Sequence, residues 1–271
     1  MHKVVLPKKV TFSAGEAPHQ GSIIIEPCFP GYGTTLGNSL RRALLSSLPG
    51  AAVVGVKIKG ANHEFAALER VKEDVLEILL NLKKLRLKIF SATEGEIIKL
   101  ELKVKGEKKI TATDIVKNSQ VEIVNEDLHI AEITDKQGSF EAEIFVSSGY
   151  SYVSIENRAE TREKEVGYIE LDSIFTPIQA VRVSVENVRV GQMTDWDKLI
   201  IDITTDGTID YRAAFKAAVD ILVEQFDFLQ EHAAETDEQE NKKTKKQKGK
   251  KNKEKENVAA DDDVTEEKQD E

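Results

Sequence analysis

Apolar and polar residues alternate in short runs along most of the first 233 positions, and these runs are rich in β-branched side chains. Both features are typical of β-strands with one buried face. The segments that we assign as strands are 3–12, 21–27, 51–60, a series of short runs between 85 and 153, 169–190 and 198–205. Pro177 lies within the run 169–190, where it predicts an edge or a break.

Three other segments have apolar residues spaced by three and four positions, which predicts helices. The first helix covers 35–48 and ends at Pro49-Gly50. The second covers 70–85, and the third runs over 211–230 after Asp210, a residue suited to cap a helix N-terminus. Many strands combined with three helices predict a fold of the α+β class.

The first and last helices are apolar over more than one face, whereas a surface helix normally has a single apolar stripe. In the first helix Leu45 lies beside the main stripe, next to Arg41 and Arg42. The main apolar residues of the two helices are Leu36, Leu40, Leu44, Phe215, Leu222, Phe226 and Leu229. Two arrangements explain this breadth equally well: a symmetric dimer, or deep packing inside one domain.

Residues 234–271 form a charged segment of low complexity, with lysines clustered between 242 and 255 and acids dominant after 260. Such a segment buries too little apolar surface to offset the entropy of ordering, so we expect it to be disordered. Its lysine block has two interpretations, a basic arm that touches nucleic acid or a solubilising tail. We favour the tail, because a polybasic block alone is a weak signal.

Composition narrows the class of protein further. The chain has 271 residues and a net charge of −10. This negative charge argues against a surface that binds the phosphates of nucleic acid by itself. Cys28 is the only cysteine, so no disulfide forms within the chain, and a small buried side chain is its expected role. Since no apolar run has the length of a signal peptide or a membrane span, we expect a soluble, cytoplasmic protein.

The motifs of common active sites are absent from the sequence. It contains no glycine-rich phosphate loop, its five histidines lack the spacing of metal ligands, and one cysteine excludes a thiolate zinc site. The aspartates between 195 and 210 do not match a calcium loop, and we assign them to turns and caps. We therefore expect no catalytic residue, metal or cofactor in this chain.

Several stretches resemble the bacterial RNA polymerase α subunit, and they occur in the order found in that family. They are LGNSLRRALLSSLPGAAV (36–53), HEF (63–65), VKEDVLEILLNLKKL (71–85), TATDI (111–115), VEIVN (121–125) and the long run GYIELDSIFTPIQAVRVSVENVRVGQMTDWDKLIIDITTDGTID (167–210). The resemblance extends over nearly all of residues 20–230, and its first part and the run 167–210 are highly specific.

The resemblance implies a fold of two domains and a homodimer. One domain, of sheet plus two long helices, comes from both chain ends, 1–51 and 177–233, and forms the dimer. The other, 52–176, is inserted and mainly β, while 234–271 is the charged tail. The dimer is then the platform on which the β and β′ subunits of the polymerase assemble.

The resemblance also implies which residues meet each partner. Arg42 and Leu45 match positions that the family uses toward β. The positions facing β′ are Glu77, Lys83, Leu171, Ile178 and Lys198. Without the resemblance, Glu77 and Lys83 are ordinary exposed charges and Leu171 is an ordinary core residue. The apolar stripes of the two wide helices become the homodimer interface.

The implied activity belongs to the complex, a nucleotidyltransferase whose catalytic subunits hold magnesium. Family members usually continue into a C-terminal helical domain that contacts DNA, whereas this sequence continues into the charged tail. We therefore expect DNA contact only through the complex. Two alternatives remain: a dimeric scaffold of another assembly, and a small nucleic-acid-binding module that uses the tail.

Overall fold

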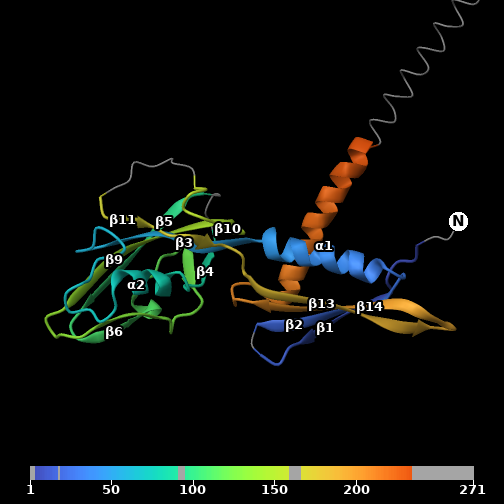
Figure 1. The fold of residues 1–271 in the computed structure, drawn as a ribbon, viewed down its shortest axis with the longest axis horizontal. Helices are drawn as coiled ribbons and strands as arrows, with labels where there is room; N and C mark the ends of the chain where they lie inside the picture. The colour runs from blue at the N-terminus through green and yellow to red at the C-terminus, as the bar shows by residue number, and fades with distance from the viewer. Residues whose placement is uncertain (1–3, 18, 91–94, 159–165, 234–271) are drawn as a thin grey trace, which may run out of the picture. The chain divides into compact units, whose positions relative to one another are not determined.

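The computed structural model describes residues 4–17, 19–90, 95–158 and 166–233, and the predicted tail 234–271 lies outside the described residues. Strands predominate, and the described ranges hold three α-helices: α1 (Tyr32–Ser46), α2 (Val75–Leu82) and a helix over 211–233 (Figure 1). This confirms the predicted mixture of many strands with three helices.

The first sheet has four antiparallel strands in the order β1-β2-β14-β13. Their bounds are β1 Lys9–Ala14, β2 Gln20–Cys28, β13 Ile178–Val190 and β14 Met193–Thr205. Ile23 pairs with Ile201 and Ile25 with Leu199, so these four buried side chains share one face of the sheet. The sheet therefore joins strands from the start of the chain to strands that lie far along it.

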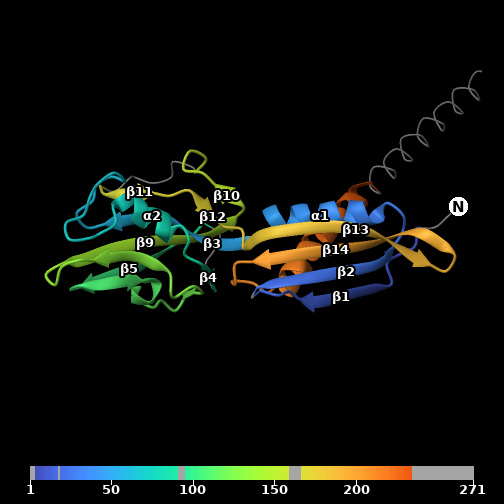
Figure 2. The same cartoon turned by 60° about the horizontal axis from the view of Figure 1, so that its bottom comes forward.

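Helix α1 and residues 211–221 both cover that face. A Cβ atom added to Gly37 of α1 would lie 2.6 Å from Cγ1 of Val183 and 2.9 Å from Cδ1 of Leu199, so α1 approaches the sheet closely (Figure 2). A Cβ atom added to Gly21 of β2 would likewise collide with the ring of Tyr211, so this ring also lies close against the sheet. Gly21 pairs with Ile203, which points to the same side as Leu199.

A second sheet has six strands, in the order β5-β9-β3-β4-β7 with β11 beside β3. These strands are β3 Pro49–Ile58, β4 Leu87–Ile89, β5 Ile97–Lys105, β7 Val121–Ile123, β9 Ser139–Tyr150 and β11 Tyr168–Glu170. Two short pairs accompany it: β6 (Lys108–Thr111) with β8 (His129–Ile133), and β10 (Tyr152–Val153) with β12 (Ser173–Ile174).

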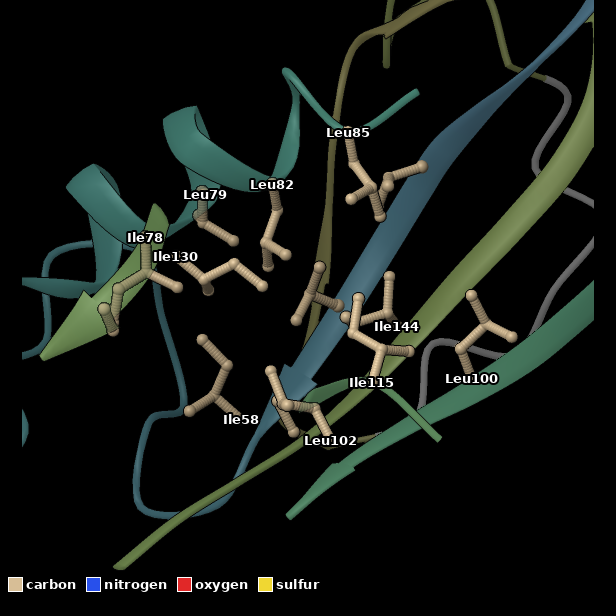
Figure 3. Packing of buried hydrophobic residues seen from close by; sticks show 14 of the residues in the cluster. Ile58, Ile78, Leu79, Leu82, Leu85, Leu100, Leu102, Ile115, Ile130 and Ile144 are labelled. Carbon is tan, nitrogen blue, oxygen red and sulfur yellow. The ribbon is translucent and has the colours of Figure 1, made fainter. Parts of the chain in front are cut away.

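Helix α2 closes the core over this second sheet. Its buried residues are Val75, Ile78, Leu79 and Leu82. Figure 3 shows Ile78, Leu79 and Leu82 facing Ile144 of β9 and Leu102 of β5 across the core. The buried cluster draws on residues between Val53 and Leu171.

Several predicted elements differ from the structure in extent, among them the strand expected at 198–205, which is β14 and begins at Met193. The strand expected at 3–12 is β1, which begins at Lys9. The helix expected at 70–85 is α2, which begins only after Asp74 because that side chain accepts the Glu77 N–H at 2.7 Å. The run expected as one strand over 169–190 is divided into β11, β12 and β13, and the last of these breaks falls around Pro177, as predicted.

Candidate assembly interface

Helix α1 carries two different surfaces. Its buried residues are Gly33, Gly37, Leu40, Ala43 and Leu44, and they face the four-stranded sheet. Leu44 is 0% exposed, and Leu36 is half-buried. The apolar surface of Leu40 and Leu44 is thus covered within one chain, and their predicted place in a homodimer interface stays a prediction.

The outer surface of α1 displays the paired arginines. Arg41 and Arg42 are exposed, and Leu45 is half-buried. Arg42 and Leu45 are three positions apart, so they are neighbours on the helix surface. A planar guanidinium beside an aliphatic side chain suits a protein partner, because it binds carboxylates or carbonyls in a fixed fork.

Asp197 of β14 fixes the start of α1. Its carboxylate accepts the N–H of Gly33 at 3.0 Å, where a negative charge also interacts favourably with the helix dipole. Asp197 lies inside β14 and the N-cap residue of α1 is Gly31, so this aspartate acts from a distant strand and not in the local turn or cap that the sequence predicted. The thiol of Cys28 is buried, and burial, followed by the nearby Asp197 carboxylate, raises its pKa. Cys28 is therefore the small buried side chain that the sequence predicted.

The helix over 211–233 begins at its predicted cap, since Asp210 accepts the N–H of Arg212 at 3.2 Å. Ala214 and Ala218 are buried, and the ring of Phe215 meets that of Phe12 edge to face with 5.9 Å between centroids.

Residues 222–233 contrast with this first part of the helix, because none of them is buried. Leu222 is half-buried, whereas Phe226 and Leu229 are each 61% exposed. Val223 and Phe228 are exposed as well. A contiguous apolar surface of this kind on a helix is typical of an interaction site.

The five positions matched to β′ contacts fall into two groups. Glu77, Lys83 and Leu171 lie around α2 and the turn between β11 and β12. Lys83 Nζ lies 3.5 Å from Oδ2 of Asp172, the residue after Leu171, so the structure brings Lys83 and Leu171 together. Glu77 is exposed, while Leu171 is 8% exposed and belongs to the core cluster.

The second group lies on the four-stranded sheet. Ile178 is buried and pairs with Thr205, whereas Lys198 pairs with Glu186 and binds its carboxylate at 3.1 Å. Thr205 and Lys198 are seven residues apart on β14. At about 3.3 Å per residue, Ile178 and Lys198 are therefore too far apart to touch each other.

The sequence also matches known proteins. The family described as RNA polymerase Rpb3/RpoA insert domain matches residues 56–176. A DNA-directed RNA polymerase subunit alpha from Syntrophomonas wolfei is 48% identical over 204 residues, which cover 75% of this chain and 63% of the relative. Another, from Macrococcus caseolyticus, is 43% identical over 241 residues, which cover 89% of this chain and 74% of the relative. The chain belongs to the RNA polymerase α-subunit family.

The chain matches a different share of the length of each relative. This α-family chain spans less than two thirds of the length of the first relative and about three quarters of the second. The matched insert domain, 56–176, contains α2 and most of the six-stranded sheet. None of the helices in the described ranges combines the length and the apolar run needed to cross a bilayer.

Sequence reasoning missed three side chains that organise the insert. Glu73 is buried, with His129 Nε2 at 2.8 Å from its Oε1 and the Glu132 N–H donating to its Oε2 at 2.7 Å. Arg158 and Asp172 bind backbone groups of neighbouring segments. Their partners are distant in sequence, so no local motif marks these residues. The only trace of Glu73 in the sequence is its place as an acid just before the apolar run of α2, and its burial became apparent only in the structure.

Proposed function

We propose that this chain is the α subunit of a bacterial DNA-directed RNA polymerase and acts as the homodimeric scaffold on which β and β′ assemble. The observation that carries the proposal is 43% identity over 241 residues, which cover 74% of a protein named as that subunit. The chain contributes structure to a nucleotidyltransferase complex in the cytoplasm, while catalysis and magnesium binding belong to other subunits.

The scaffold has two domains in this proposal. The dimerisation domain comprises 1–51 and 177–233, and the inserted domain comprises 52–176. Two findings support the division: β1, β2, β13 and β14 form one sheet, and the insert-domain family matches 56–176.

The homodimer uses the apolar surface of the last helix. Phe226 and Leu229 are exposed in a single chain, and Leu222 and Phe215 are half-buried. A second copy of the same surface would remove these side chains from water, and the gain is largest for Phe226 and Leu229, because full burial of such a side chain contributes about 1.5–3 kcal/mol and these two have the most exposed area left to bury. The predicted contribution of α1 rests mainly on Leu36, because Leu40 and Leu44 are already covered.

Each large partner meets a different surface. Arg42 and Leu45 on the outer side of α1 contact β. The β′ subunit contacts the group around Lys83, Glu77 and Leu171, and a second group formed by Ile178 and Lys198. Since Leu171 and Ile178 are largely buried, we expect them to act mostly by shaping the contact surface.

The direct test is reconstitution with the β and β′ subunits of the same organism, followed by mass measurement of the product. We expect a complex of two copies of this chain with one β and one β′. A stable monomer would contradict the proposal, and a dimer that binds neither β nor β′ would favour a scaffold for another assembly.

Arg42 provides the matched test of the β surface. We expect Arg42→Ala to leave the dimer intact and to weaken β binding by about tenfold, or about 1.4 kcal/mol. Arg41→Ala removes the same charge one position away and serves as the control, with β binding close to that of the unmodified chain. Equal loss in both variants would show that the positive charge of the pair matters and not Arg42 itself.

A further inference from the structure

The guanidinium of Arg158 joins three segments of the insert domain. Its Nη1 donates to the carbonyl of Val54 in β3 at 2.6 Å. Its Nη2 donates to the carbonyl of Leu171 at 3.0 Å and to the hydroxyl of Ser173 at 2.8 Å. Val54 and Ser173 are buried, so these contacts are largely withdrawn from water. A single planar group thus spans acceptors on β3 and on both sides of Asp172.

Asp172 binds back to the segment that carries Arg158. Its Oδ1 accepts the N–H of Ile155 at 3.0 Å, and the hydroxyl of Tyr152 also donates to its carboxylate. Segment 152–158 and residues 171–173 therefore hold each other through side chains in both directions. The remaining oxygen of Asp172 faces Lys83 Nζ at 3.5 Å.

This reciprocal arrangement determines where Leu171 and Lys83 lie. The Leu171 backbone is fixed twice, since its N–H donates to Val54 O at 3.1 Å and its carbonyl accepts from Arg158. Lys83 is the C-cap residue that follows α2. Its flexible side chain has many rotamers, and the contact with Asp172 selects among them. The positions of Leu171 and Lys83 therefore both depend on the side chains of Arg158 and Asp172.

We propose that Arg158 is a positioning residue for β′ capture, which holds Leu171 and Asp172 so that Lys83 is presented in one orientation. The inference rests on the proposed function, because it takes Lys83 and Leu171 as β′-facing residues. Arg158 itself is half-buried and need not touch the partner.

The test compares Arg158→Ala and Arg158→Lys in the full chain, with separate measurements of dimer mass, β binding and β′ binding to the preformed complex with β. We expect Arg158→Ala to weaken β′ binding by about tenfold and to leave the dimer and β binding unchanged. We expect Arg158→Lys to recover only part of this loss, because one ammonium cannot span acceptors that a planar fork joins.

Arg70→Ala is the matched control, since the Arg70 guanidinium also donates to a loop carbonyl, that of Gln137, at 3.2 Å. We expect normal β′ binding in this variant. If Arg158→Ala does not fold, the lysine variant carries the test through its β′ binding relative to its β binding.

Two results would overturn the inference: unchanged β′ binding in folded Arg158 variants, or equal loss of β and β′ binding, which a general loss of structure would cause. Full recovery in Arg158→Lys would also contradict it, because charge alone would then suffice. Failure of the unmodified chain to bind either subunit would instead refute the proposed function.

Discussion

Two eight-residue helical segments of this chain have similar apolar content but different surroundings. Helix α2, Val75–Leu82, reads VLEILLNL, and residues 222–229 read LVEQFDFL. Four of the eight α2 side chains are buried in the core of the six-stranded sheet. In 222–229 no side chain is buried. Apolar pattern therefore measures how much surface a helix has to cover, and it does not say which chain covers it.

The difference separates two kinds of contribution to the molecule. The apolar face of α2 stabilises the fold in which it lies, so its loss is expected to unfold one chain. The apolar face of 222–229 adds little to a single chain, so its loss is expected to change association and leave the fold unchanged. The following predictions test this contrast, from the largest expected effect to the smallest.

The largest effect is expected for Leu82→Ala in α2. Leu82 is 0% exposed, and removal of a buried leucine side chain leaves a cavity that costs about 2–5 kcal/mol. Leu80→Ala on the same helix is the control, because Leu80 is 53% exposed and its loss costs about 0.5 kcal/mol or less. Denaturant unfolding measures both values. Equal destabilisation by the two changes would show that α2 is not packed as described.

A smaller effect, on association alone, is expected for Phe226→Asp. A charge in an apolar interface lacks the water that stabilises it, so we expect the dimer to weaken by about thirtyfold, or about 2 kcal/mol. Analytical ultracentrifugation gives the dissociation constant, and the unfolding midpoint of the monomer stays the same.

Gln225→Asp is the control for that change. It adds the same charge at the adjacent exposed position, which points about 100° away around the helix. Dimerisation is expected to persist in this variant. An unaltered dimer in Phe226→Asp would remove residues 222–229 from the interface.

The smallest effect is expected for Glu73→Gln, which changes the anchor just before α2. Burial raises the pKa of Glu73, but the hydrogen bonds from His129 and from the Glu132 N–H lower it, and the pKa lies below its ordinary value of 4.5. Ionised Glu73 therefore stabilises the fold above about pH 4.5, and this contribution is lost as the pH falls through the folded-state pKa.

At pH 7 we expect Glu73→Gln to cost about 1–2 kcal/mol, because the backbone N–H of Glu132 and His129 lose a charged acceptor. The cost is expected to shrink as the pH falls through the folded-state pKa of Glu73, because the carboxylate of the unmodified chain then becomes protonated. Urea unfolding at several pH values measures the difference. A cost that is independent of pH would mean that the charge of Glu73 is not what stabilises this region.

The local sequence pattern predicted the helices and strands of this fold better than it predicted which segments they pack against. Apolar spacing located α1, α2 and the last helix, and Pro177 marked a real break. The predicted start of α2 was too early. The apolar repeat extends back to Val71, but Asp74 caps the helix, so the helix begins only at Val75.

The candidate site was less accessible to sequence reasoning from the residues alone. Arg42 and Lys83 were chosen through the resemblance, and by themselves they are ordinary surface charges. The contacts that organise the insert join residues far apart, such as Arg158 with Val54, and no periodicity carries that information. The stripe of Leu40 and Leu44 was correctly identified as apolar, but its covering surface is the chain's own sheet.

The pairing of β2 with β14 has a consequence for synthesis on the ribosome. β2 ends at Cys28 and β14 begins at Met193, so 164 residues separate the two strands. At about 5–20 residues per second, translation takes roughly 8–33 s to cross that gap. During this interval the free edge of β2 and the apolar side of α1 have no β14 to pack against. The strands encoded between β2 and β14 therefore have time to form their own core first.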